Sequence, residues 1–164
     1  MILMSIDAST KATGVAIFDE KKLIHYDCLY ENDTNVLNRI DNMANRLASL
    51  ALEYKVNVVA LEDVLPDDVK HNQQIYTALM YLQGAIALAL NRINLKINQL
   101  FVASNWRKTV GIKTGRGVYR DVLKKASMKL VKEHYNIDVS DDISDAIGVG
   151  IAYLKQQDEE FNWE

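Results

Sequence analysis

The chain has 164 residues, of which 49% are hydrophobic and 25% charged, and its formal net charge at pH 7 is −3. This composition is ordinary for one globular domain, here residues 1–164, with a core that needs no disulfide staples. A single cysteine excludes an internal disulfide framework, and the longest apolar run, 78–90, is interrupted by Gln83 and too short to span a membrane. No cationic leader precedes the first strand, so we expect a cytoplasmic protein that makes no membrane contact.

A buried strand that ends in a carboxylate opens the chain. Residues 2–6 are almost entirely apolar, which is typical of a central strand, and Asp7 follows at a place where a carboxylate is unfavourable unless something binds or pairs with it. Gly14 and its polar neighbours predict a turn and a return strand that ends near Phe18. Residues 22–30 alternate loosely and predict a third antiparallel strand.

Two helices and two strands are predicted next. The polar residues 32–34 are expected to cap a helix over about 36–54, whose apolar positions keep helical spacing. Residues 55–62 form a β-branched strand that again ends in acids. A second helix is expected over about 68–91, and a further strand over 95–103.

The last third of the chain is predicted to be mainly helical. Ser104 is expected to cap a short helix, and residues 111–117, which hold three of the seven glycines, are expected to form a mobile basic loop. An amphipathic helix is predicted over 118–135 and a final helix over about 140–157.

This order of elements predicts an α/β fold with a five-stranded mixed sheet, in which three antiparallel strands are followed by two parallel ones, flanked by helices. Strand–helix–strand crossovers are right-handed, so the fourth strand is expected to lie parallel to the first and beside it. Asp7 and Glu62 would then lie at the same end of neighbouring strands.

Positive charge is concentrated in residues 105–134, which hold nine Lys and Arg and only two acids in a chain whose net charge is −3. One basic face on an otherwise acidic protein favours a nucleic-acid partner, although a solvated helix face is the competing interpretation. Trp106 either stacks on a base or belongs to the core. The residues that we predict to contact DNA are Arg107, Lys108, Lys113, Arg116, Arg120 and Lys124.

Acidic residues recur at the start of the final helix. Asp142 and Asp145 are three positions apart and therefore share one helix face. For Asp141 and Asp142, capping and interaction with the helix dipole are the simpler interpretation. Asp145 precedes a long uncharged run and is expected to be packed down.

Carboxylates that converge from two strand ends and a helix start would repel one another without a counter-charge. Hard divalent cations with oxygen ligands remove that repulsion, so we predict Mg²⁺, with Mn²⁺ as a substitute. Two such ions, about 3.5–4 Å apart, can activate a water and stabilise the leaving oxygen of a phosphodiester. Zinc is disfavoured, because the chain has one cysteine and its three histidines lack ligand-like spacing.

Three motifs together resemble the RuvC-type Holliday junction resolvases, which belong to the RNase H-like nucleases. They are Ile6-Asp7 with Gly14 after it, Leu61-Glu62, and the run Asp142-Ile-Ser-Asp145-Ala-Ile. The resemblance covers almost the whole chain, and residues 106–153 are most similar to phage-borne members. It implies an RNase H-like fold and a homodimeric, Mg²⁺-dependent endonuclease that nicks two strands of a four-way DNA junction, in the host cytoplasm if the chain is phage-encoded.

The resemblance also implies roles for individual residues. Asp7, Glu62, Asp142 and Asp145 match the family's four catalytic, metal-binding acids, and the family's basic residues upstream of the last acids would fall among Lys113, Arg116 and Arg120. The helix from Ile75 to Leu90 is apolar on all sides, which fits either a core helix or a dimer contact. A homodimeric family favours the dimer contact.

Two departures from the family pattern broaden the expected substrate range. Bacterial members carry Pro-Gly where this chain has Ala8-Ser9, and an aromatic residue near the junction core where it has Leu65, so action on other branched DNA is also expected. The alternatives are a related RNase H-like nuclease acting on RNA or other nucleic-acid structures, and a non-catalytic DNA-binding module. Sugar-kinase, actin and heat-shock ATPases also begin with Asp-x-x-Thr-Lys, but they need a second domain that 164 residues do not supply.

Overall fold

A computed structural model describes residues 1–66 and 72–157 of the chain and contains one five-stranded sheet. The strands are β1 (Ile2–Asp7), β2 (Ala12–Asp19), β3 (Lys22–Tyr30), β4 (Val58–Asp63) and β5 (Gln99–Val102), in the spatial order β3-β2-β1-β4-β5. β1 and β3 each pair antiparallel with β2, whereas β4 pairs parallel with both β1 and β5. The predicted α/β fold with a mixed sheet is confirmed.

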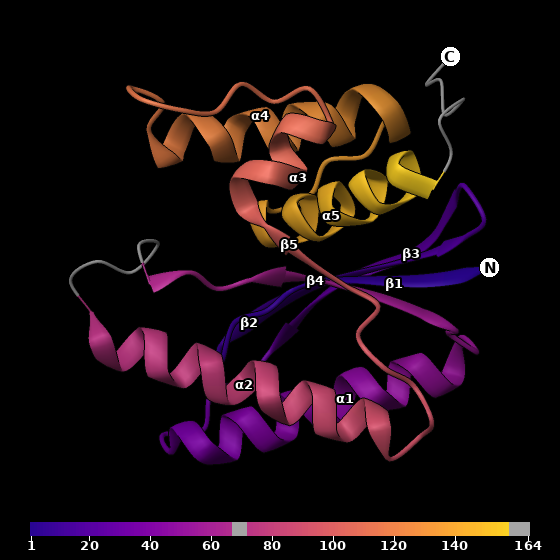
Figure 1. Ribbon diagram of the computed structural model, residues 1–164, viewed down its shortest axis with the longest axis vertical. Helices are drawn as coiled ribbons and strands as arrows, with labels where there is room; N and C mark the ends of the chain where they lie inside the picture. Colours follow the sequence, from indigo (N-terminus) through magenta and orange to yellow (C-terminus); the bar gives the residue numbers. More distant parts are fainter. Residues whose placement is uncertain (67–71, 158–164) are drawn as a thin grey trace.

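Helices cover both faces of this sheet (Figure 1). The helices are α1 (Val36–Glu53), α2 (Gln73–Asn91), α3 (Ala103–Thr109), α4 (Arg120–Tyr135) and α5 (Asp141–Gln157). α1 and α2 lie side by side on one face, and α3, α4 and α5 lie on the other, so the sheet separates two apolar cores. In the parts of the chain that the structure describes, no helix has both the length and the apolar character needed to cross a bilayer.

The predicted ends of several elements were wrong by a few residues. β4 begins at Val58 instead of residue 55, because the backbone N–H of Val56 donates to Ala51 and closes the end of α1. β5 begins at Gln99 instead of residue 95, after Asn98 has exchanged two hydrogen bonds with Val59. The predicted start of the second helix near residue 68 lies outside the described residues.

Helix caps were also predicted imperfectly. The cap of α1 is Asn35 rather than residues 32–34, and its side chain accepts a hydrogen bond from the N–H of Leu37 at 2.8 Å. Ser104 lies inside α3, which starts after Val102 without any side-chain cap. α4 begins at Arg120, two residues later than predicted.

The start of α5 is fixed against the middle of the sheet. The buried hydroxyl of Ser5 on β1 donates to the carbonyl of Ala146 at 2.7 Å. On β2, Gly14 meets α5 so closely that a Cβ atom there would lie 1.9 Å from the carbonyl oxygen of Asp142. The acidic first turns of α5 are therefore held directly over the end of β1.

Candidate active site

Strand register brings the first two predicted acids together. β1 and β4 are parallel with Ile6 beside Leu61, so Asp7 and Glu62 follow at the same end of neighbouring strands, as predicted. Asp142 and Asp145 approach from the start of α5. All four carboxylates line a single cavity of about 920 Å³.

Crowding of these acids has a clear electrostatic signature at Asp7. Loss of hydration, followed by repulsion from Glu62, Asp145 and Asp142, raises the pKa of Asp7 well above its ordinary value. Burial is also the main cause that raises the pKa of Asp142 and of Asp145. The four side chains therefore form one cluster of mutually repelling negative charges that a bound cation would stabilise.

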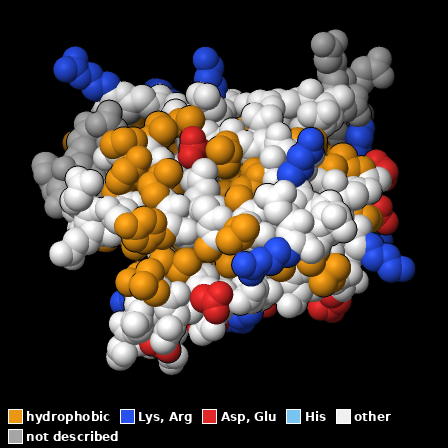
Figure 2. Space-filling model, turned by 60° about the horizontal axis from the view of Figure 1, so that its bottom comes forward, with side chains coloured by type: hydrophobic (Ala, Val, Ile, Leu, Met, Phe, Trp, Pro, Cys, Tyr) orange, Lys and Arg blue, Asp and Glu red, His pale blue; other side chains and the backbone are white. Residues whose placement is uncertain are grey.

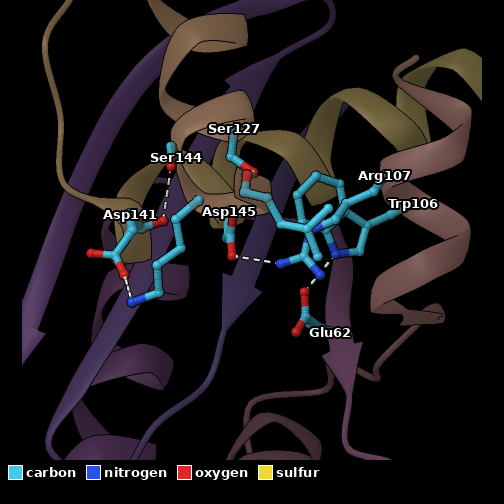
Figure 3. A network of polar contacts seen from close by, with 9 residues as sticks. Glu62, Trp106, Arg107, Ser127, Asp141, Ser144 and Asp145 are labelled. Carbon is cyan, nitrogen blue, oxygen red and sulfur yellow. Dashed lines mark hydrogen bonds and ion pairs between the residues drawn. The ribbon is translucent and has the colours of Figure 1, made fainter. Parts of the chain in front are cut away.

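Two neighbouring residues on α3 contact the cluster (Figure 3). The indole N–H of Trp106 donates to Glu62 Oε2 at 2.5 Å, and Nη2 of Arg107 donates to Asp145 Oδ2 at 2.8 Å. Arg107 also lies over the Trp106 ring, with 4.7 Å between its Cζ and the ring centroid. Trp106 is fully buried, so the interpretation as a core residue holds and base stacking by this side chain is excluded.

Asp141, the neighbouring acid, has a different partner. It forms an ion pair with Lys124, and that contact is the main cause that lowers its pKa. Within the described residues Asp142 forms no such ion pair, and burial raises its pKa instead. The capping interpretation therefore describes Asp141 incompletely, because its carboxylate also ties α4 to the start of α5.

The predicted DNA-contacting residues fall into two groups. Arg107, Arg120 and Lys124 line the cavity, whereas Lys108, Lys113 and Arg116 are not among the residues that line it. The cavity also has two basic residues that the sequence analysis did not select, Lys11 in the turn after β1 and Arg39 on α1. One feature of the sequence could have identified Lys11, which lies four positions after Asp7. No feature identifies Arg39, which is an isolated cation on a helix.

The donor set suits a hard divalent cation. Carboxylate oxygens are the ligands that Mg²⁺ and Mn²⁺ prefer, and Asp145 Oδ1 is buried without a hydrogen-bond partner in the described structure. Among residues 1–66 and 72–157, however, the side chains do not stand in a ready-made group of three or more ligands. The chemistry of the site fits a metal ion, and two of its four acids accept hydrogen bonds from side chains of α3.

A mixed sheet of this order, with acids at the ends of β1 and β4 and at the start of the last helix, defines the RNase H-like class of nuclease folds. A family model described as "Crossover junction endodeoxyribonuclease RuvC" matches residues 3–153, and the chain belongs to this RuvC family.

Solved structures show the same fold at low sequence identity. Thermus thermophilus RuvC in complex with a Holliday junction substrate has a TM-score of 0.75 and 11% identity, over 96% of this chain and 95% of that one. The yeast mitochondrial Holliday junction resolvase Ydc2 has a TM-score of 0.61 and 11% identity, over 94% of this chain and 78% of that one. Cas12f1 in its complex with sgRNA and target DNA has a TM-score of 0.57 and 16% identity, over 90% of this chain and 49% of that one. No curated protein is significantly similar to the chain by sequence.

Proposed function

We propose that the chain is a structure-selective DNA endonuclease, active in the cytoplasm, that resolves four-way junctions and other branched DNA by paired hydrolysis of phosphodiesters. The observation that carries the proposal is the single cavity, in which the four family-matching acids and three predicted DNA-contacting cations meet. Membership of the RuvC family supports the reaction, and the Thermus relative seen with a Holliday junction substrate supports the DNA structure.

The acids would hold Mg²⁺ or Mn²⁺, with Asp7 and Glu62 on the sheet and Asp142 and Asp145 on α5 as ligands. Bound at these carboxylates, two such ions would supply activation of a water and stabilisation of the leaving oxygen. Asp7 lies at the end of a central strand, and its rigid backbone fixes one edge of the site. Glu62 is oriented by Trp106, so the two strand-borne ligands are both positioned before substrate arrives.

The cations would hold the DNA backbone. Arg107, Arg120 and Lys124 flank the acids within the cavity, where they can neutralise phosphates on either side of the scissile bond. Lys108, Lys113 and Arg116 belong to the same basic segment beyond the cavity and would contact more distant phosphates. These contacts read the position of the backbone and carry no sequence information.

A panel of matched substrates tests the proposal. With Mg²⁺, four-way and three-way DNA junctions should be nicked at least about tenfold faster than linear duplex of the same sequence, because only branched DNA offers the strand geometry proposed here. RNA junctions should remain intact. Equal cutting of linear duplex would contradict structure selectivity, preferential cutting of RNA would favour the RNA-directed alternative, and DNA binding without any cutting would favour a binding module.

Paired cleavage of a junction needs two active sites, and we infer that α2 supplies the dimer contact. Figure 2 shows apolar side chains gathered on the face of the molecule formed by α1 and α2. On α2 the exposed large apolar residues are Ile75, Met80, Tyr81 and Leu88. Gly84 is exposed between them, and no atom would lie within 4 Å of a Cβ added there, so nothing in the described chain requires a glycine. A closely approaching second helix would explain it.

Tyr81→Glu should therefore convert a dimer into a monomer. Tyr81 is 59% exposed, so the charge is tolerated in the single chain but would be buried without a partner in the dimer. Light scattering coupled to gel filtration measures the mass. Val122→Glu, an exposed apolar position on α4 across the sheet, is the matched control and should remain dimeric. A Tyr81→Glu protein with unchanged mass would exclude this face.

A further inference from the structure

Two adjacent residues of α3 each contact one of the four acids. The two acids that they contact lie on different elements of the fold. Trp106 contacts Glu62, the acid on β4, and Arg107 contacts Asp145, the acid on α5 (Figure 3). The two contacts differ in how easily they can be broken, and that difference is the basis of the inference.

Trp106 has no freedom to move. Its side chain is fully buried in the core between the sheet and α5. The ring packs so tightly against α5 that a Cβ atom at Gly148 would lie 2.4 Å from Trp106 Cζ3. With the ring fixed, the direction of its single N–H is fixed as well, and Glu62 Oε2 is held at that point. The indole N–H therefore acts as a rigid positioning donor.

Arg107 can move. Its side chain lines the cavity and is 13% exposed, and it reaches Asp145 through one nitrogen while its Nε has no hydrogen-bond partner in the described structure. Asp145 likewise uses only Oδ2 in this pair; its Oδ1 has no hydrogen-bond partner in the described structure, and the nearby Ser127 hydroxyl opposes the rise that burial causes in its pKa. A bidentate pair would be stronger, so this single contact is one that a divalent cation can replace.

We propose that Arg107 is a displaceable counter-ion of the metal-free site, and that Trp106 is a fixed positioning residue for Glu62. Before metal binds, the guanidinium neutralises Asp145; when Mg²⁺ or Mn²⁺ binds the carboxylates, Arg107 leaves Asp145 and the Trp106 contact stays. The inference rests on the proposed metal-dependent nuclease. It accounts for a cavity lined by four acids in which no ready-made ligand group is present among the described residues.

Metal affinity without DNA tests the displacement. Mn²⁺ binding is measured by electron paramagnetic resonance, which counts the free ion. Arg107→Met should bind Mn²⁺ about tenfold more tightly than the unaltered chain, since a competing charge at ion-pair distance is removed. Arg120→Met is the matched control: Arg120 lines the same cavity without an ion pair to the four acids in the described structure, so its loss should change affinity by less than about threefold. Equal changes in both variants, or no change in Arg107→Met, would overturn the inference.

The tryptophan itself reports whether Arg107 moves. Trp163→Phe leaves Trp106 as the only tryptophan of the chain, which has two. Because the guanidinium lies over the Trp106 ring, adding Mg²⁺ should change its fluorescence in a saturable manner, and Arg107→Met should abolish that change. Metal binding without any fluorescence change would show that Arg107 stays in place and would overturn the displacement.

Trp106→Phe tests the positioning role. Removal of the N–H should weaken Mn²⁺ binding about 10-fold or more, as for other residues that orient a metal ligand. A purely structural role would lower the melting temperature and leave Mn²⁺ affinity unchanged in the folded fraction, and that result would overturn the assignment. If the unaltered chain binds no Mn²⁺, the proposed metal site fails as well; if it cuts junctions normally while the Arg107 variants bind Mn²⁺ unchanged, only this inference fails.

Discussion

Asp7→Asn is expected to abolish Mg²⁺-dependent cleavage of four-way junctions, with a rate loss on the order of 10³ or more. Asp7 is the acid whose position is most rigidly determined, because β1 pairs with strands on both sides. Burial first, and then repulsion from the other three acids, raises the pKa of Asp7, so it shares one site with them. An amide there keeps the shape of the side chain and removes the negative charge that a metal ion needs.

Single-turnover cleavage and junction binding in EDTA separate chemistry from recognition. Binding should be unchanged or slightly tighter, since the phosphates lose a repelling charge. Glu62→Gln should behave in the same way. Asp41→Asn, an exposed acid on α1, is the control and should cut normally. A normal cleavage rate in Asp7→Asn would remove Asp7 from the catalytic site.

The dependence of the melting temperature on pH gives an independent test of the raised pKa of Asp7. The folded pKa of Asp7 lies above its ordinary value of about 3.9, so its contribution to stability is fully present at lower pH and is lost as the pH rises through the raised folded pKa. In EDTA, the melting temperature of the unaltered chain should therefore fall over that range. Asp7→Asn should show a smaller fall and a higher melting temperature at neutral pH.

The fold was predictable because its signals are local and strong. The apolar strand before Asp7 and the β-branched strand before Glu62 needed only the right-handed crossover to become neighbours. Ends of elements were less predictable, because they depend on contacts between distant residues. Residues 55–57 have strand-like sequence, yet Val56 closes α1 and the N–H of Asn57 donates to the carbonyl of Ile2.

The acids of the candidate site were predictable from motifs, whereas their immediate partners were not. Trp106 and Arg107 lie in a basic segment whose composition suggested DNA contact for Arg107 and left Trp106 open between base stacking and the core. Only the packing of α3 against α5 shows that the indole is buried and that Arg107 faces Asp145. Lys11 reaches the cavity from the turn after β1 and Arg39 reaches it from α1, and no spacing rule connects these two residues with the acids of α5.

Gly14→Ala is expected to disrupt the site without touching any acid. Gly14 pairs with Asp7 across β1 and β2, and its missing Cβ leaves room for the backbone of α5. A methyl group there would lie 1.9 Å from the carbonyl oxygen and 2.5 Å from the carbonyl carbon of Asp142. Because the atoms that this methyl group would meet belong to the backbone, no rotation of a side chain can relieve the clash. The start of α5 must therefore shift.

That shift should lower cleavage about 10²-fold, since a displacement near 1 Å moves Asp142 and Asp145 relative to Asp7. It should also destabilise the fold by about 1–3 kcal/mol, as overpacking does in other cores. Denaturant unfolding measures the second effect. Gly84→Ala, made in the Tyr81→Glu monomer, is the matched control, because in the single chain the same methyl group meets open space in a helix and should keep or raise stability. If Gly14→Ala unfolded like the unaltered chain and cut normally, α5 would not be held by this contact, and the placement of Asp142 would need another cause.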